Sequence, residues 1–364
     1  MTLSCILRYL KIHCYGTCVL ALLCITQCSA ADLPSGLNRT ADADTAETGQ
    51  LDIQQEPPPE QSRRGTIKYR PTEQEDQVPL QFRLPAEPFI YDVHPLDVTS
   101  KSPAVSLVTF PSAIETSQPN NNTVHCEYYR PKAEGERPGV VVLHILGGSF
   151  ELSRICCRAL ASKGIGALFM KMPHYGPRRQ PGSNARMVSD DPHETVRGMS
   201  QAVLDVRRSA AWLAAREEID PNQLGITGIS LGGIVSALAF SAEPRFQKGC
   251  FVLAGGDLAE TFWKSQKFSN LRERWAANGK NKEDLQELLS TIDPAVLASK
   301  KSEPRILMFN AKHDELIPYS CTMKLWQAYG EPEIVWWNTG HYTAIWELPA
   351  CLVQMSHFFN SKLP

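Results

Sequence analysis

The sequence predicts an α/β fold: a mostly parallel, doubly wound sheet with a small helical cap. After residue 138, short apolar runs alternate with longer segments of helical periodicity, which is typical of a parallel sheet covered by helices on both faces. Ahead of these runs, the segments 104–110 and 123–129 are rich in Val, Phe and Tyr and are flanked by Pro and Asn. They predict two antiparallel strands that lead into the parallel part.

The strands of the parallel part are expected where the apolar runs lie. These runs cover 140–144, 167–172, 224–228, 250–254, 306–310 and 334–337. Apolar residues at helical spacing over 152–160 predict a helix that Gly164 ends, and a longer stripe over 196–213 predicts a second helix. The alternation of strand and helix therefore supports layers on both sides of one sheet.

One segment interrupts this alternation. Residues 258–300 are polar and helix-like, with Trp and Leu at intervals. We interpret them as a cap inserted into a domain that spans 78–364. Such a cap is expected to overhang the pocket and to influence substrate choice; ordinary helices on the flank of the sheet are the alternative.

The N-terminal region has a different composition. Arg8 and Lys11 precede an apolar run over 15–26, and small residues follow at 29–31, which is the pattern of a secretory signal peptide. We therefore predict a signal peptide over 1–30 and export to the periplasm or the medium; an uncleaved N-terminal anchor is the alternative. Residues 31–77 are polar and Pro-rich at their centre, which predicts a disordered linker.

Charge and cysteine content narrow the expected partners. The 37 basic and 39 acidic side chains nearly cancel, so no strong field attracts nucleic acid or an anionic membrane, and neither is predicted as a partner. Beyond the leader, Cys156 and Cys157 are adjacent in an expected helix, the other cysteines are widely scattered, and none shows metal spacing. Buried thiols are a better interpretation of them than a disulfide framework or a metal site.

The pentapeptide Gly228-Ile229-Ser230-Leu231-Gly232 follows the apolar run 224–228 and precedes a helix of small residues. A serine hydroxyl needs a nearby base and an exposed, rigid position in order to act as a nucleophile. A sharp turn between strand and helix provides that position, and the flanking glycines let the turn pack closely. Ser230 is the predicted nucleophile.

The base and its acidic partner should follow the serine, on loops after later strands. His341 follows the run 334–337, and Asp314 follows the run 306–310. The carboxylate would hold the imidazole in the tautomer that accepts the serine proton. Asp257 and, more weakly, Glu315 are rival acids, while His313 is a poor rival base because it lies on the acid loop.

Two backbone amides should stabilise the oxyanion that forms on the acyl group. One is the N–H of Leu231; the other is expected from Leu146 or Gly147 in the turn after 140–144, which could also be a plain glycine turn. Another loop, 172–179, ends on the same edge of the sheet. Its Arg178 and Arg179 could contact an acidic substrate group, although a solvated loop is the preferred interpretation.

From about residue 104 to the C-terminus, the element order and the motifs around Ser230, Asp314 and His341 resemble the α/β-hydrolase superfamily. The segment 220–233 looks like the nucleophile region of the dienelactone-hydrolase-like and acetyl-xylan-esterase-like branches. Dienelactone hydrolases themselves carry cysteine at the position of Ser230, and the turn at His144 lacks the full His-Gly-Gly-Gly of lipase-type esterases. The resemblance implies acyl-group hydrolysis without a metal or an organic cofactor.

The resulting prediction is a serine hydrolase that cleaves a small-molecule or carbohydrate ester through an acyl-enzyme on Ser230. A serine peptidase of the prolyl-oligopeptidase type is the alternative enzyme. A binding relative of the fold without activity is the alternative outside enzymes.

Overall fold

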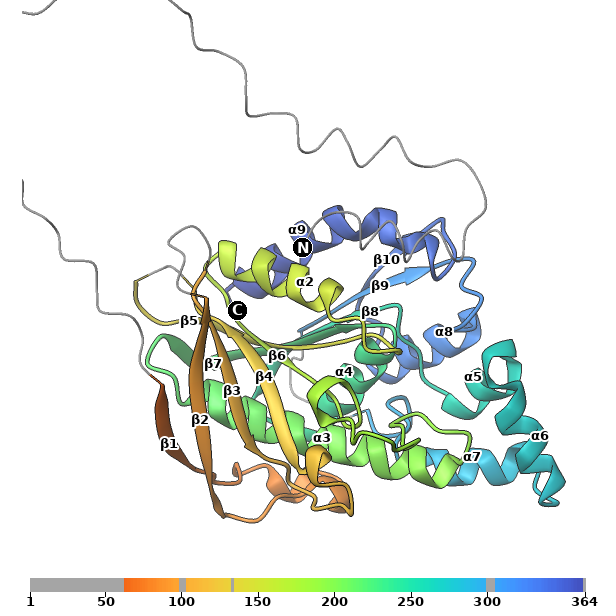
Figure 1. Cartoon of the computed structure of the whole chain (residues 1–364). Coiled ribbons are helices and arrows are strands. Elements are labelled where there is room, and N and C mark those ends of the chain that lie inside the picture. Colours follow the sequence, from red (N-terminus) through yellow and green to blue (C-terminus); the bar gives the residue numbers. More distant parts are fainter. Residues whose placement is uncertain (1–61, 98–102, 132–133, 299–304, 363–364) are drawn as a thin grey trace, which may run out of the picture. The chain divides into compact units, whose positions relative to one another are not determined.

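A computed structural model describes residues 62–97, 103–131, 134–298 and 305–362. The described residues form one ten-stranded sheet (Figure 1). Its strands lie in the order β1 (Arg63–Lys68), β2 (Pro88–Asp97), β3 (Val105–Pro111), β4 (Thr123–Tyr129), β6 (Gly166–Met170), β5 (Arg137–Leu143), β7 (Ile219–Ile229), β8 (Phe246–Val252), β9 (Arg305–Ala311) and β10 (Glu333–Trp337).

The predicted α/β fold class is confirmed. Strands β5 to β10 pair in parallel, and β1 to β4 are antiparallel to their neighbours, including β4 against β6. Each predicted strand overlaps an observed one; the strand predicted over 123–129 coincides with β4, and the others have shifted ends. For example, β8 ends at Val252 because Leu253 has a φ of 51° and its N–H donates to Phe309 O across the sheet end. The parallel strands therefore bring their carboxyl ends to one edge, where the loops with the predicted functional residues lie.

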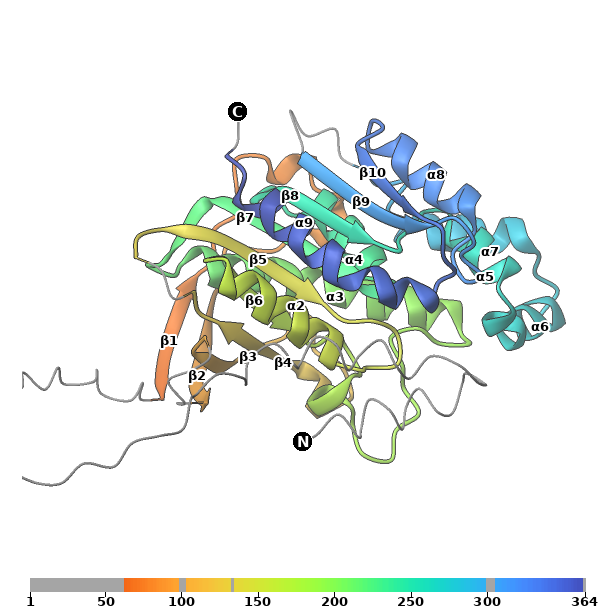
Figure 2. The same ribbon diagram turned by 90° about the horizontal axis from the view of Figure 1, so that it is seen from above.

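Helices cover both faces of the sheet (Figures 1 and 2). On one face lie α2 (Glu151–Ser162) and α9 (Leu348–Asn360); on the other lie α3 (Pro192–Ala214), α4 (Leu231–Ala242) and α8 (Tyr319–Ala328). Helix α3 begins where the Asp191 side chain accepts the N–H of His193 and Pro192 occupies the first turn. Two apolar cores result, one on each face of the sheet.

The segment interpreted as a cap lies between β8 and β9 and is helical. It contains α5 (Leu258–Lys264), a 3₁₀ turn at Gln266–Phe268, α6 (Ser269–Ala277) and α7 (Lys282–Ser290). Helix α7 starts with a capping box, in which Asn281 and Asp284 each accept the other's backbone N–H. Leu271, Trp275, Leu285 and Leu289 are buried and anchor the segment to the core on the α3 face.

The linker prediction is wrong over residues 62–77, since they contain β1 and a 3₁₀ turn at Glu75–Gln77. The polar segment around Glu75 is held by an ion pair with Arg207, which is far from it in the sequence. The guanidinium of Arg207 on α3 is fully buried and donates to both oxygens of Glu75, at 2.8 and 2.6 Å, and to Glu243 at 3.2 Å. Local periodicity carries no sign of such a partner. The predicted signal peptide and the linker from 31 to 61 lie outside the described residues.

A second buried ion cluster joins β4 to its neighbours. Glu127 accepts from Lys171 at 2.8 Å and from Arg154 at 2.8 Å, and Tyr129 donates to it at 3.0 Å. Burial acts to raise the pKa of Glu127, but the hydrogen bonds and charges of the two cations outweigh it and lower the pKa from 4.5 to about 2. The carboxylate is therefore charged near neutral pH.

The prediction of buried thiols is confirmed for the cysteines that the structure describes, because all of them are free and buried. Within the described ranges, none of the helices has both the length and the apolar character needed to cross a bilayer.

Candidate active site

Ser230 occupies a tight turn between β7 and α4. Its φ of 56° and ψ of −118° lie outside the regions that residues other than glycine ordinarily adopt. Its N–H donates to Val252 O at 2.8 Å, and its carbonyl accepts the N–H of Ile234 at 3.0 Å, so both sides of the turn are held. The serine hydroxyl is thereby presented at the carboxyl edge of the sheet.

The two glycines of the pentapeptide are required by close backbone contacts. A side-chain carbon at Gly228 would lie 2.4 Å from the backbone of Gly232. One at Gly232 would lie 2.7 Å from the carbonyl oxygens of Leu143 and His144. The turn is packed directly against the end of β5, and no other residue type fits at either position.

The structure brings the three predicted residues together in one chain of hydrogen bonds. Ser230 Oγ lies 2.9 Å from His341 Nε2, and His341 Nδ1 lies 2.8 Å from Asp314 Oδ2. The His341 and Asp314 side chains are 7% and 3% exposed, so the imidazole–carboxylate contact is shielded from water. The other oxygen, Asp314 Oδ1, accepts the N–H groups of Leu316 and Ile317 at 2.9 and 2.7 Å, which fixes the carboxylate plane.

The two loops that carry these residues are joined through their backbones. Lys312 donates to Trp337 O at 2.9 Å, and His313 donates to Thr339 O at 3.0 Å. Strands β9 and β10 therefore continue to pair beyond their ends, and this pairing holds the acid loop beside the histidine loop. Residues far apart in the sequence meet because parallel neighbours end at the same edge.

This arrangement can move a proton. With Nδ1–H donating to the carboxylate, the Nε2 lone pair faces the serine hydroxyl and can accept its proton. The buried carboxylate then stabilises the imidazolium.

The rival residues lie elsewhere or act differently. Asp257 caps α5 by accepting from Glu260 N at 3.0 Å, and it pairs with Lys324. His313 is exposed and contacts Asn338 Oδ1 at 3.0 Å. Glu315 has a contact that the sequence reasoning missed: its Oε2 accepts the backbone N–H of His341 at 2.8 Å. The only indication of this contact in the sequence is that Glu315 directly follows Asp314.

The turn after β5 lies beside Ser230 and is supported by His144. Burial lowers the pKa of His144 to about 4, so the imidazole is neutral. Nδ1 donates to Ile145 O at 2.8 Å, and Nε2 accepts the N–H of Met172 at 3.0 Å. Burial raises the pKa of the Tyr175 phenol to about 12, although the nearby backbone of Gly147 acts to lower it. Leu231 opens α4, where the first N–H groups have no acceptor within the helix.

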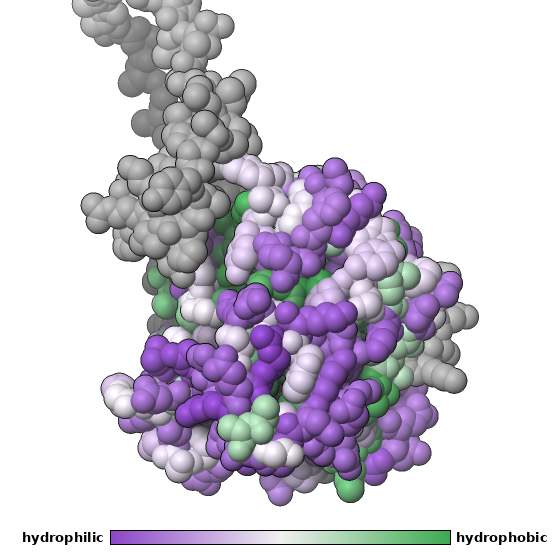
Figure 3. Space-filling model, turned by 90° about the vertical axis from the view of Figure 1, so that its right-hand side faces the viewer, coloured by the Kyte–Doolittle hydropathy of each residue, from purple (hydrophilic) through white to green (hydrophobic). Residues whose placement is uncertain are grey.

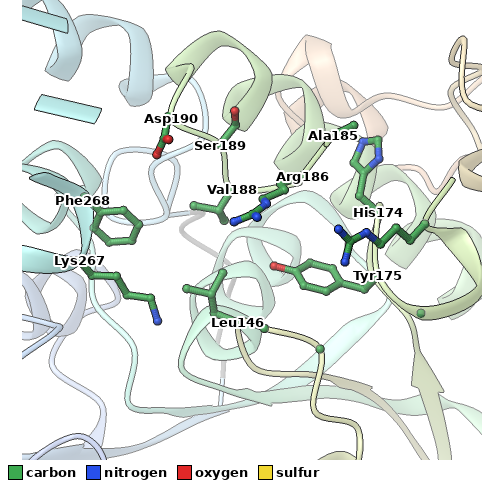
Figure 4. A pocket seen from close by; sticks show the side chains of 14 residues that line it. Leu146, His174, Tyr175, Ala185, Arg186, Val188, Ser189, Asp190, Lys267 and Phe268 are labelled. Atoms are coloured by element: carbon green, nitrogen blue, oxygen red, sulfur yellow. The ribbon is translucent and has the colours of Figure 1, made fainter. Parts of the chain in front are cut away.

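A cavity of about 410 Å³ adjoins this turn (Figure 4). Leu146, Gly147 and Gly148 form one side, the loop 174–190 forms another, and Lys267 and Phe268 of the insertion close it. Ser230 and His341 are not among its lining residues. Its size suits a small organic molecule.

The two arginines of loop 172–179 have different environments. The preferred interpretation, a solvated loop, is wrong for Arg178: its side chain has no exposure and pairs with the equally buried Asp205 at 2.7 Å. Arg179 is exposed and lines the cavity. Among the residues that the structure describes, no group of three or more His, Cys, Asp or Glu side chains is arranged to hold a metal ion.

Two family models match parts of the chain. Residues 199–331 match the model of the prolyl oligopeptidase family, and residues 108–254 match that of α/β hydrolase domain containing 18. An uncharacterised protein of Mycobacterium tuberculosis is 29% identical over 180 residues, which are 49% of this chain and 42% of the relative. The match therefore spans less than half the length of that relative. An uncharacterised protein of Bacillus subtilis is 27% identical over 84 residues, which are 23% of this chain and 72% of the relative.

Solved structures share the fold. The acetyl xylan esterase from Paenibacillus sp. R4 superposes with a TM-score of 0.59 at 22% identity, covering 75% of this chain and 89% of that one. Acetyl xylan esterase 1 from Thermoanaerobacterium sp. JW/SL YS485 gives a TM-score of 0.55 at 16% identity, covering 73% and 88%. At these identities the likeness shows the arrangement of helices and strands.

Proposed function

Because this chain belongs to the α/β-hydrolase superfamily, and its relatives support a serine hydrolase, we propose that it cleaves carboxylic esters through an acyl-enzyme on Ser230. The observation that carries the proposal is the hydrogen-bond chain from Ser230 Oγ through His341 to Asp314, at 2.9 and 2.8 Å. A nucleophile, a base and an acidic partner in contact are the minimum that acyl transfer requires.

The proposed reaction has two steps. In the first, Ser230 Oγ attacks the acyl carbon while His341 Nε2 takes the hydroxyl proton, and the alcohol then leaves with that proton. In the second, His341 takes a proton from water, the resulting hydroxide attacks the acyl-enzyme, and the acid departs as the proton returns to Ser230. Each step passes through an oxyanion, and each donor aimed at it is worth about 3 kcal/mol.

We propose that the oxyanion is bound by the N–H groups of Leu231 and Leu146. The first follows the nucleophile and opens α4, so it is free to donate to a ligand. Sequence reasoning left Leu146 and Gly147 as alternatives for the second donor. Leu146 is preferred because it is nearer along the chain to Leu143 and His144, whose carbonyl oxygens pack against the nucleophile turn at Gly232.

Esters are preferred over peptides as the substrate class because the two solved structures compared above are acetyl xylan esterases by name. A small-molecule or carbohydrate ester remains the proposed substrate. The match of 199–331 to the prolyl oligopeptidase family supports a serine peptidase as the second candidate.

A fluorophosphonate probe tests the nucleophile. Intact protein should be labelled on the peptide that contains Ser230, and Ser230→Ala protein should not. Equal labelling of the two proteins would refute the assignment. Hydrolysis of 4-nitrophenyl acetate, compared with aminoacyl-proline 4-nitroanilides, then separates an esterase from a peptidase, since only the peptidase should favour the anilides.

A further inference from the structure

The cavity beside the β5 turn contains an excess of positive charge. Arg179 and Arg186 come from the loop between β6 and α3, and Lys267 comes from the insertion between β8 and β9. All three residues are exposed. Among the residues that the structure describes, no carboxylate forms an ion pair with any of them. The acid that lines the cavity, Asp190, lies 3.9 Å from Arg274.

The two adjacent arginines of the loop after β6 have different environments. Arg178 turns inward and pairs with Asp205 at 2.7 Å, whereas Arg179 faces the cavity. In Figure 4 the guanidinium of Arg186 lies between Val188 and the hydroxyl end of Tyr175. Lys267 reaches toward the same space from the opposite side. Two separate segments thus place cations around one space.

The remaining lining is apolar. Leu146, Val188, Phe268 and the ring of Tyr175 provide surfaces for an organic group. Figure 3 shows the face on the right-hand side of Figure 1, where most of the surface is hydrophilic and hydrophobic residues lie in recesses and in a few surface patches. A ligand that combines an apolar body with an anionic group would neutralise the cations and cover the apolar surfaces.

We propose that this cavity binds the carboxylate of an acidic ester while the ester bond lies at Ser230. The proposal rests on the proposed function, because it gives that site its substrate class. Leu146 lines the cavity and is also the proposed oxyanion donor, so with that role of Leu146 a ligand held there would extend to the acyl centre. Arg186 and Lys267 are the specificity-determining residues, and the Arg fork suits the two oxygens of a carboxylate.

Matched pairs of esters that differ in charge alone test the proposal on the full chain. The first pair carries the charge on the leaving group: 3-acetoxybenzoate and 3-acetoxybenzamide. The second carries it on the acyl group: the 4-nitrophenyl esters of glutaric acid and of glutaramic acid. The acidic member of at least one pair should have the higher kcat/KM by about tenfold at low ionic strength, and the advantage should shrink in about 0.5 M salt. 3-Acetoxyphenyl phosphate, tested as a further substrate, shows whether the site prefers a carboxylate or a phosphate. A kcat/KM higher than that of 3-acetoxybenzoate would mean that the site binds a phosphate and not a carboxylate.

Variants locate the effect. Arg186→Gln and Lys267→Gln should each reduce the acidic-to-neutral ratio by about threefold or more, on the scale of one exposed charge contact. Arg64→Gln is the matched control, because Arg64 is an exposed cation on β1 at the far edge of the sheet, and it should leave the ratio unchanged. An equal fall in the control, or no acidic preference in either pair, would overturn the proposal.

Binding separates this proposal from the proposed function. Calorimetry with Ser230→Ala protein should show that 3-hydroxybenzoate binds more tightly than 3-hydroxybenzamide, and Arg186→Gln on that background should remove the difference. Carboxylate binding without hydrolysis of any ester would refute the esterase and keep the anion site. Hydrolysis of neutral esters without carboxylate binding would keep the esterase and refute the anion site.

Discussion

Replacing Asp314 by asparagine tests the hydrogen-bond chain at the point where its geometry is most constrained. Asp314 Oδ1 accepts two backbone N–H groups, and Oδ2 accepts from His341 Nδ1. In the variant, the amide oxygen keeps the two backbone bonds only if its NH₂ group faces His341. Turning the amide over would lose two hydrogen bonds, at about 1 kcal/mol each, and would leave two buried donors unsatisfied.

The amide therefore forces the imidazole into the wrong tautomer. Nδ1 must accept from the asparagine, so Nε2 carries the proton and can no longer accept one from Ser230. A change of this kind costs a factor of about 10⁴ in kcat, or about 5 kcal/mol in activation free energy. Because the two side chains have the same shape, the thermal midpoint should change by no more than a few degrees.

The rate of fluorophosphonate labelling and the hydrolysis of an aryl acetate measure the loss. Asp257→Asn is the matched control, since Asp257 follows the neighbouring strand β8 but caps α5 and pairs with Lys324. It should label at a rate close to that of the parent. If Asp314→Asn keeps more than about a tenth of the parent rate, the assigned orientation and role of the carboxylate are wrong.

Three further predictions concern Glu315, Gly232 and Glu127. Glu315→Leu should lower kcat/KM by about tenfold, because it leaves the backbone N–H of His341 without its acceptor. Glu315→Gln keeps an acceptor oxygen and should retain most of the parent rate. Equal losses in the two variants would contradict this role of Glu315. Gly232→Ala should abolish labelling or folding, because the added carbon would lie 2.7 Å from His144 O, and a fully active variant would contradict the packing. The pKa of Glu127 is lowered in the fold from 4.5 to about 2, because its cationic neighbours outweigh burial. Its charged form therefore stabilises the fold by about 3 kcal/mol. This contribution to the free energy of unfolding is complete above pH 4.5 and is lost as the pH falls toward 2. Urea unfolding at pH 3 to 7 should show Glu127→Gln destabilised most at the upper end, and a constant deficit across that range would refute the assignment.

The fold and the residues of the site were predictable because they depend on local patterns. Apolar runs in alternation with helical stripes predicted the parallel part of the sheet, and Ser230, Asp314 and His341 each stand just after a strand. The early strands β1 and β2 were missed because they are ordered by pairing within the sheet, and the turn at Glu75–Gln77 was missed because its partner is Arg207 on α3. No local pattern reveals a partner more than a hundred residues away.

The sequence by itself determined which residue types stand at the ends of neighbouring strands, since strand order along the chain and turn chemistry are local properties. Only the tertiary structure decided which side chains meet. Pairing beyond the ends of β9 and β10 places Asp314, and not Asp257, behind His341. Packing also turns Arg178 inward to Asp205 while Arg179 stays at the cavity, because a buried charge needs a partner and the fold supplies one for a single arginine.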